Sequence, residues 1–365
     1  MSQDNDRQCE ALQGSLLGLM VGDTFGLPCE GIAPKRLARL FPGSLRQRLI
    51  FGKGMVSDDS EHAAMTAAAL ARYSGNVDQF AKSLAWRLRW WLARLPAGVG
   101  LATGRALIKL WLGFPVGRSG VWSAGNGPAM RAPIIGVTLG SKPERMLAYL
   151  QASTQLTHRD PKALVGAIAA ARAAYLAAQG QVEIASYKSD LQRFFKQLEP
   201  SAATGAAVSE FNTLLDRLDL ALQKGLSPAQ YAQQLGLERG VTGYMYHTMP
   251  IVLYVWLQHQ HDYAAGIAQI VALGGDTDTT AAILGGILGA GVGEKGIPAP
   301  WLQGIRDWPF NPAYFRVLAE RVDLAINQGQ TVRIPLLPGP LLLLRNLVFL
   351  VIVLWHGFRR LAPPY

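Results

Sequence analysis

Two pairs of acidic residues stand at the starts of two predicted helices. Asp276 and Asp278 lie one residue apart in GGDTDTTAAILGGILGAGVG, and Asp58 and Asp59 are adjacent in SDDSEHAAMTAAALARY. A single acid at a helix N-terminus is stabilised by the helix dipole and needs no other role. Two acids beside apolar packing are costly to ionise unless a cation, a helix terminus or a hydrogen-bond network receives them. We therefore expect positive charge near these pairs.

The side chains around the acids suggest what that charge is. Both helix starts also carry hydroxyls, from Ser57 and Ser60 in one case and from Thr277, Thr279 and Thr280 in the other. Carboxylates and hydroxyls are hard oxygen ligands that suit Mg²⁺ or Mn²⁺, and no Cys or paired His suggests zinc. Two bridged ions would neutralise the acids and orient a water molecule. Spacing alone leaves one alternative open, which is that the acids are independent helix caps.

A third segment, LMVGDTFGLPCEG, combines glycine with acid near the N-terminus. Gly22 and Gly26 permit close backbone approach, and Asp23 and Glu30 follow an apolar run at a predicted turn. Taken alone, this segment predicts an N-cap Asp and a surface Glu.

The elements that must position these residues are helices. Apolar residues recur at helical spacing and alternating runs typical of strands are rare, so we predict an all-α fold. The predicted helices span residues 10–20, 60–73, 78–94, 101–112, 143–155, 161–178, 186–197, 207–223, 227–235, 244–258, 262–272, 278–290 and 313–328. No Ser- or Pro-rich linker divides the body, which predicts one domain over residues 1–330 and a separate tail over 331–365.

Composition sets broad limits on the class of protein. The chain has 365 residues, of which 50% are hydrophobic and 16% charged, and a net charge of +10 that favours polyanionic partners. Only Cys9 and Cys29 are present, and the start MSQDNDRQCE lacks an apolar signal region. These features predict a cytoplasmic, reduced protein without a disulfide scaffold.

The tail is strongly apolar. A spanning helix needs about 20 apolar residues, but Arg345 and Asn346 interrupt the run LLPGPLLLLRNLVFLVIVL. Basic residues flank it on both sides, namely Arg333, Arg359 and Arg360. Two interpretations stay open: a helix docked on the domain or on a partner chain, and a membrane contact, peripheral or anchored, through residues 336–358.

The segment WRLRWWLARL alternates basic and aromatic residues, as some single-strand nucleic-acid binders do. Helical spacing instead predicts a core helix with Trp86 and Trp90 facing inward and Arg87 and Arg94 in solvent. The sequence contains no P-loop, no GxGxxG after a strand and no GxSxG elbow, so kinase, dehydrogenase and serine-hydrolase functions have no support.

Taken together, the motifs resemble those of the ADP-ribosylglycohydrolases, the DraG-like hydrolases. That family's GDxxGxxxE, [ST]DD[ST] and GGDTDT segments appear in order as GDTFGLPCE, SDDS and GGDTDT. The resemblance continues through GVGLATGRAL, GNGPAMRAPIIG, THRDP and GYMYHTMP, and covers roughly residues 10–295. It implies an all-α domain with a two-metal cleft.

The resemblance also assigns roles to individual residues. It implies that two Mg²⁺ or Mn²⁺ ions are held by Ser57, Asp58, Asp59, Asp276, Asp278 and Thr279. It implies that ADP-ribose lies against Gly125, Asn126, Gly127, Met130, Arg131, His158 and Tyr244. The catalytic acids would be Asp59, Glu30 and Asp276, and the identity of the general base stays open.

The implied reaction is release of ADP-ribose from an ADP-ribosylated protein, nucleic acid or small molecule, by cleavage at the anomeric carbon of the ribose. Two alternatives stay open: a non-catalytic ADP-ribose-binding or structural member, and a two-metal hydrolase of another nucleotide-like substrate. The chain departs from the common pattern in Ser57 and Ser60, where threonine is usual, and in His62, where methionine is common. The serines keep the hydroxyl, whereas His62 could change the floor of the site.

Overall fold

The computed structural model describes residues 2–327, 332, 334 and 337–359, and these residues form seventeen α-helices. The predicted all-α fold is confirmed. The α-helices are α1 (Ser2–Gly26), α2 (Pro34–Leu40), α3 (Asp58–Tyr73), α4 (Val77–Ala93), α5 (Leu101–Trp111), α6 (Ala132–Leu139), α7 (Pro143–Gln155), α8 (Pro161–Gln179), α9 (Ile184–Phe195), α10 (Ala202–Gln223), α11 (Pro228–Gln234), α12 (Met245–Gln258), α13 (Tyr263–Ala272), α14 (Thr277–Val292), α15 (Ala299–Gln303), α16 (Pro312–Asn327) and α17 (Gly339–Arg359). Short 3₁₀ helices cover η1 (Leu27–Cys29), η2 (Val116–Arg118), η3 (Ala129–Arg131) and η4 (Glu294–Gly296).

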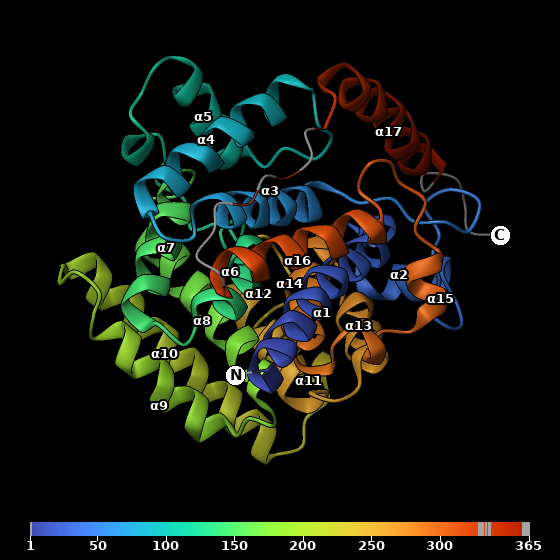
Figure 1. Cartoon of the computed structure of the whole chain (residues 1–365). Coiled ribbons are helices and arrows are strands. Elements are labelled where there is room, and N and C mark those ends of the chain that lie inside the picture. The colour runs from blue at the N-terminus through green and yellow to red at the C-terminus, as the bar shows by residue number, and fades with distance from the viewer. Residues whose placement is uncertain (1, 328–331, 333, 335–336, 360–365) are drawn as a thin grey trace.

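Helices α1 and α14 form the centre of the molecule, and α14 packs along its length on the C-terminal half of α1 (Figure 1). Glycines at every fourth position of α1 allow direct contact between the two backbones. A Cβ atom added at Gly22 would lie 2.0 Å from the carbonyl oxygen of Ala281, and one at Gly18 would lie 2.3 Å from that of Gly285. The close backbone approach predicted for Gly22 and Gly26 is therefore confirmed. The turn predicted to begin at Asp23 is misplaced, because Asp23 lies within α1 and the chain turns only at Glu30 and Gly31.

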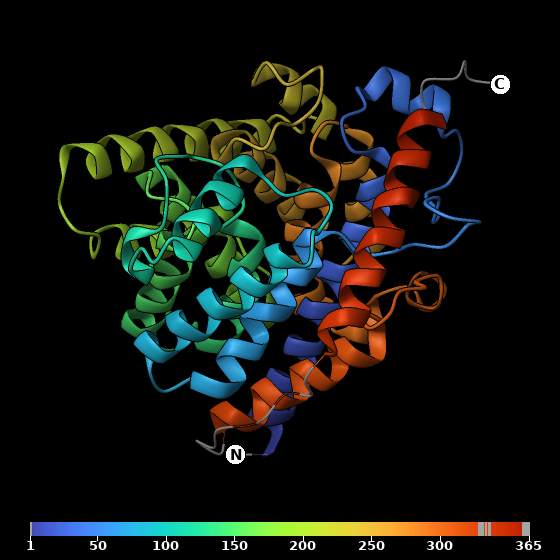
Figure 2. The ribbon, with the colours of Figure 1, turned by 90° about the horizontal axis from the view of Figure 1, so that it is seen from above.

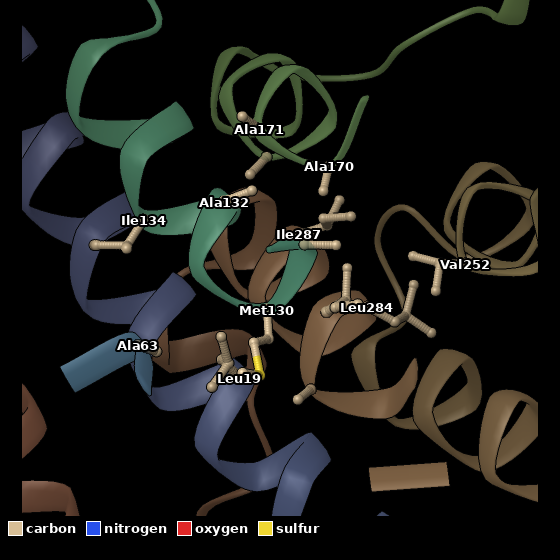
Figure 3. Packing of buried hydrophobic residues seen from close by; sticks show 14 of the residues in the cluster. Leu19, Ala63, Met130, Ala132, Ile134, Ala170, Ala171, Val252, Leu284 and Ile287 are labelled. Carbon is tan, nitrogen blue, oxygen red and sulfur yellow. The ribbon is translucent and has the colours of Figure 1, made fainter. Parts of the chain in front are cut away.

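The other helices surround this pair. Helices α8, α12 and α13 pack on α14, and α6 and α16 pack on α1 (Figures 1 and 2). Figure 3 shows the core between them, where small side chains such as Ala170 and Ala171 of α8 lie beside Ala132 of α6, and Leu284 and Ile287 of α14 lie close by. Small residues let the helices approach closely and hold the N-termini of α3 and α14 in fixed positions.

Helical spacing located most helices, including α3 and α14 to within two residues at their starts. It missed the short helices α2, α6 and α15, and it stopped α1 six residues early.

The predicted orientation of α4 is partly wrong. Leu88 and Trp91 are buried, but Trp86 is 57% exposed and Trp90 is 40% exposed. The two tryptophans pack edge to face with each other, and Trp90 does so with Trp111 of α5. Trp90 therefore packs on α5, and neither tryptophan enters the core.

The apolar tail forms helix α17, which lies on the outside of the molecule (Figures 1 and 2). By length and composition it is the one described helix able to cross a membrane, with a mean hydropathy of 2.0 in its most apolar window, of which 28% is buried. Its inner face is docked on the domain, so this part of the tail prediction holds for Gly339–Arg359. The predicted domain boundary at 330/331, Arg333 and Arg360 lie outside the described residues.

Candidate active site

The N-terminus of α3 is held by an acid from another helix. Asp23 of α1 accepts hydrogen bonds through Oδ2 from the backbone N–H of Ser57 at 2.9 Å and of Ser60 at 3.2 Å, and from Ser60 Oγ at 2.5 Å. Burial raises the pKa of Asp23 to about 6, against the opposing effect of these hydrogen bonds. Asp23 therefore caps α3 and not its own helix. It fixes the direction in which Asp58 and Asp59 leave the helix start.

The N-terminus of α14 meets that of α3. Thr279 Oγ1 donates a hydrogen bond to Asp59 Oδ2 at 3.1 Å, although the two residues are 220 positions apart. Asp276 stands at the N-cap position of α14 and accepts a hydrogen bond from Asn126 Nδ2 at 2.7 Å. The two acidic segments that the sequence singles out thus lie side by side.

The acids at this junction are desolvated and repel one another. Burial is the main cause that raises the pKa of Asp58, Asp59, Asp276 and Asp278. Neighbouring carboxylates, among them Glu30, Asp23 and one another, raise the pKa of Asp58, Asp59 and Asp278 further. Buried Asp59 Oδ1 and Asp278 Oδ1 have no hydrogen-bond partner among the described residues. Repelling acids with unsatisfied buried oxygens are expected where a cation completes the site.

The donor set fits a hard divalent ion in chemistry, because it consists of carboxylate and hydroxyl oxygens. Among the residues that the structure describes, no three His, Cys, Asp or Glu side chains are grouped closely enough to form a metal site by themselves. The acids of the α3 and α14 starts lie near one another but do not form a ready-made group of metal ligands. Metal binding and the six predicted ligands therefore stay predictions.

A cleft of about 650 Å³ opens above the acids, a volume typical of small-molecule sites. Eleven of the predicted site residues line it: Glu30, Ser57, Asp58, Gly125, Asn126, Gly127, Met130, His158, Asp276, Asp278 and Thr279. Three predicted residues are absent from its lining, namely Asp59, Arg131 and Tyr244. Asp59 is buried directly beneath, between Ser57 and Thr279.

The glycine-rich loop forms one wall over His158. A Cβ atom at Gly125 would lie 3.0 Å from His158 Nε2, and one at Gly127 would lie 3.2 Å from its Cε1. The two glycines therefore let the loop lie on the imidazole ring. His158 Nδ1 is 2.9 Å from Thr157 Oγ1, and burial, assisted by nearby Arg131, lowers the pKa of His158 to about 3. The ring is neutral near neutral pH.

Arg131 does not reach the cleft. Its guanidinium is completely buried and donates to Ser153 Oγ at 3.0 Å, to the Ser153 carbonyl at 3.1 Å and to Thr157 Oγ1 at 2.9 Å. It also lies 3.1 Å from His62 Nδ1. The contact with ADP-ribose that the resemblance implied for Arg131 is not supported by this position, because these bonds tie the guanidinium to the protein interior.

Two further predicted residues lie at the edge of the cleft. Met130 lines it but is 3% exposed and points into the core beside Leu19 (Figure 3). Tyr244 is half-buried next to Gly243 of the lining, and its hydroxyl accepts a hydrogen bond from Lys162 Nζ at 2.8 Å.

Helix α17 supplies a wall of the cleft that the sequence did not predict. Phe349 and Val353 line the cleft together with Glu30 and Ser57, and Phe349 belongs to a small buried apolar cluster with Leu27, Leu49 and Met55. His356 Nε2 lies 3.1 Å from the carbonyl oxygen of Pro28, just before Glu30.

A buried ion-pair group fastens α17 next to the acids. Arg345 donates to Glu61 Oε1 of α3 at 2.6 Å and to Asp307 Oδ1 at 3.0 Å, and it also bonds the carbonyl of Val56 at 2.8 Å. Trp91 Nε1 donates to the other oxygen of Glu61. We refer to Arg345, Glu61 and Asp307 as the Arg345 cluster. Burial raises the pKa of Glu61, and Arg345 opposes that shift.

A family model described as ADP-ribosylglycohydrolase matches residues 4–331, which is most of the chain. The chain belongs to the ADP-ribosylglycohydrolase family. The predicted enzyme class, a hydrolase of glycosyl bonds, is thereby confirmed. Helix α17 lies beyond the matched residues, so this family member carries a cleft wall outside the part of the chain that the family model covers.

Relatives cover most of the chain at modest identity. The chain is 28% identical to an uncharacterized protein of Archaeoglobus fulgidus over 82% of this chain and 93% of that protein. It is 27% identical to ADP-ribosylhydrolase ARH3 of Xenopus tropicalis, over 81% and 91% of the two chains. It is 25% identical to ADP-ribosyl-[dinitrogen reductase] glycohydrolase of Rhodospirillum rubrum, over 80% and 88%.

A solved structure described as an ADP-ribosylglycohydrolase-related protein complex has the same fold. It superposes with a TM-score of 0.64 at 24% identity and covers 87% of this chain and 98% of that chain.

Sequence reasoning gave Asp23 and Arg345 no part at the site. The Gly-Asp pair of the first motif was a sequence signal for Asp23. Because we placed Asp23 at a turn, we did not expect its side chain to cap α3. The sequence signal for Arg345 was a lone cation in an apolar helix, which requires an acid partner.

Proposed function

We propose that this chain is a divalent-metal-dependent hydrolase that releases ADP-ribose from an ADP-ribosylated acceptor. The single observation that carries the proposal is that Asp58 and Asp59 of α3 converge with Asp276 and Asp278 of the α14 start at a cleft. The ion pairs of the described residues include none between a Lys or Arg and these four acids, whereas Glu61 of α3 pairs with Arg345. Membership of the ADP-ribosylglycohydrolase family supports the substrate class.

The proposed ligands of two Mg²⁺ or Mn²⁺ ions are Ser57, Asp58, Asp59, Asp276, Asp278 and Thr279. Bound there, the ions would supply a water of lowered pKa and a fixed position for the ribose hydroxyls. Asn126, which donates to Asp276 at 2.7 Å and to Thr248 Oγ1 at 2.9 Å, holds the Asp276 carboxylate in place.

The reaction breaks the bond between the anomeric carbon and the acceptor nitrogen or oxygen, and the oxygen of water bonds to that carbon. Glu30 is the proposed proton acceptor for this water, since it is exposed at the cleft wall whereas Asp59 is buried and bonded to Ser57 and Thr279. The flanking carboxylates, Asp276 among them, would stabilise positive charge that develops on the sugar. The acceptor leaves with the proton that Glu30 took from the water, so one water molecule is consumed for each bond broken.

The remaining residues bind and orient the nucleotide. Gly125, Asn126 and Gly127 offer backbone for close contact, His158 presents a neutral ring beneath them, and Tyr244 provides an aromatic edge with Lys162. In place of a direct contact with ADP-ribose, we assign Arg131 a positioning role. It bonds Thr157, whose hydroxyl lies against His158. Met130 supports the floor from below.

The test is a release assay on ADP-ribose attached to arginine, serine, a nucleic-acid end and a small acetylated carrier, with Mg²⁺ or Mn²⁺ and with a chelator. Release from at least one substrate, lost with the chelator, is expected. Glu199→Gln, an exposed carboxylate away from the cleft, serves as the matched control for Asp278→Asn. Metal-dependent release from none of the substrates would refute the proposal, and tight ADP-ribose binding without turnover would indicate a binding protein instead.

A further inference from the structure

Helix α17 has the reverse of the usual polarity. A surface helix of a globular protein buries its apolar stripe and exposes its polar residues. In α17 the polar residues Arg345, Asn346 and His356 are buried against the domain, and no exposed position from 341 to 358 is polar. The outer face consists of apolar side chains that recur every three or four residues, including Leu344, Leu347, Val351, Leu354, Trp355 and Phe358. Val351, Trp355 and Phe358 are each more than 60% exposed.

We propose that this outer face binds the surface of an anionic lipid bilayer, with α17 lying in the plane of the membrane. An apolar helical face with aromatic residues inserts at the boundary between headgroups and acyl chains. Tryptophan favours that boundary, and Trp355 and the 47%-exposed Trp308 lie near opposite ends of the helix. Trp308, Leu341 and Val348 line one groove, so the apolar surface extends from the helix onto the neighbouring loop.

The charges around the helix favour anionic lipid over a second copy of the chain. Helix α17 contains no Asp or Glu, and exposed Arg359 ends it. Exposed Lys53 and Arg306 lie beside each other on the loops next to the groove, where Arg306 N–H bonds the Gly54 carbonyl. Basic residues at this position are attracted to the negative surface of an anionic bilayer. A second copy would instead bring two chains of net charge +10 together through the same basic residues.

The inner contacts decide against a spanning helix. At 21 residues, α17 is about 32 Å long and could cross a bilayer. Crossing would require it to leave the domain, and Glu61 and Asp307 would then lose the cation that neutralises them. It would also remove Asn346 from the Arg94 carbonyl, to which it donates at 2.9 Å. The helix therefore stays on the protein and contacts lipid with one face.

The experiment is flotation of the purified full chain with vesicles of phosphatidylcholine alone and with added phosphatidylglycerol. We expect flotation with the anionic vesicles, weaker flotation with the neutral ones, and a decrease on addition of salt. Val351→Glu should weaken binding by about tenfold or more, as a charge placed in a lipid-facing position does. Leu220→Glu, at an apolar position of α10 that is 49% exposed, is the matched control and should float like the wild type.

Failure to float with anionic vesicles would overturn the proposal, as would equal loss of binding in both variants. A lipid-free dimer detected by light scattering that Val351→Glu dissociates would assign the face to a second copy instead. Hydrolase activity in solution should be the same in wild type and Val351→Glu, because Val351 points away from the cleft lined by Phe349 and Val353. The outcome is therefore independent of the proposed function.

Discussion

Helix α3 begins between two groups of buried acids that differ in one respect. Glu61 belongs to the Arg345 cluster, where one guanidinium neutralises both it and Asp307. Asp58 and Asp59, three and two residues earlier, face Asp276 and Asp278 across the cleft floor, and within the described part of the chain no Lys or Arg forms an ion pair with them. Both groups of acids consist of Asp or Glu side chains, and they differ in whether the chain supplies a cation to pair with them.

We interpret the difference as one between a structural group and the proposed functional one. In the Arg345 cluster the chain supplies its own cation, so the charges are internally balanced and fasten α17 to α3. At the cleft floor the chain leaves the acids to repel one another, which costs stability unless a ligand from solution balances them. Substitution of an acid at the cleft floor should therefore lower activity. Substitution of Arg345 in the Arg345 cluster should instead lower the free energy of unfolding.

The largest expected effect is at the floor. Asp278→Asn removes a charge but keeps the shape of the side chain. We expect release of ADP-ribose to fall by about 10³-fold, the scale on which transition-state charge stabilisation is lost. Because Asp278 is a buried acid whose Oδ1 has no partner among the described residues, the free energy of unfolding of the metal-free protein should not decrease. Steady-state kinetics and urea denaturation measure the two quantities. Retained activity together with lower stability would make Asp278 a structural residue.

The reverse pattern is expected at the cluster. Arg345→Met leaves Glu61 and Asp307 buried without their cation, and should lower the free energy of unfolding by about 3–5 kcal/mol. The double variant Arg345→Met, Glu61→Gln should recover part of the loss, since one of the stranded charges is gone. Urea denaturation measures both, with the exposed Arg306→Met as control. A loss no larger than that of the control would show that the cluster is not balanced by Arg345.

The stabilisation of the folded protein by metal at the cleft floor should depend on pH. The folded pKa values of Asp58, Asp59 and Asp278 lie above their ordinary value, so the folded state gains stability as the pH falls through them and is destabilised by their ionisation above them. In the proposed site, bound metal would take the place of those protons. Saturating Mn²⁺ should therefore stabilise the protein by about 2–3 kcal/mol near neutral pH and by less in mildly acid buffer.

Thermal unfolding with and without Mn²⁺ tests this dependence on pH. Asp278→Asn should reduce the shift, and Arg345→Met should leave it in place. A shift that grows as the pH falls would contradict the proposed metal site.

The smallest effect is expected from Ser57→Thr, which keeps the hydroxyl that caps α3 and accepts from the Asp59 N–H at 3.3 Å. Activity should change by less than about threefold. Ser57→Ala loses the cap and should cost about 0.5–2 kcal/mol of stability in addition to activity. Rates of ADP-ribose release and melting temperatures are measured for both variants. Equal effects of the two substitutions would show that the Ser57 hydroxyl contributes neither to activity nor to stability.

The sequence predicted local structure better than it predicted contacts between side chains that are far apart in the chain. Helical spacing found α3 and α14, and the pairs of acids at their starts marked the cleft floor, because both signals lie within a few consecutive residues. The Arg345 cluster could not be found in this way, since Arg345 and Glu61 are 284 positions apart and Arg345 looked like an interruption of an apolar run. The turn predicted to begin at Asp23 was placed too early, because glycine allows close backbone approach in a helix as well as in a turn.

The contact between α1 and α14 restricts how this sequence can change. Most core side chains can be exchanged if their neighbours repack, but a methyl group added at Gly14 would lie 2.1 Å from the carbonyl oxygen of Gly289, and main-chain atoms cannot repack. The helices would have to separate at the end away from the acids and tilt, which would displace Asp278 without any substitution near it. The absence of side chains at Gly14 and Gly289, at one end of the helix pair, thus helps to determine where the carboxylates lie at the other end.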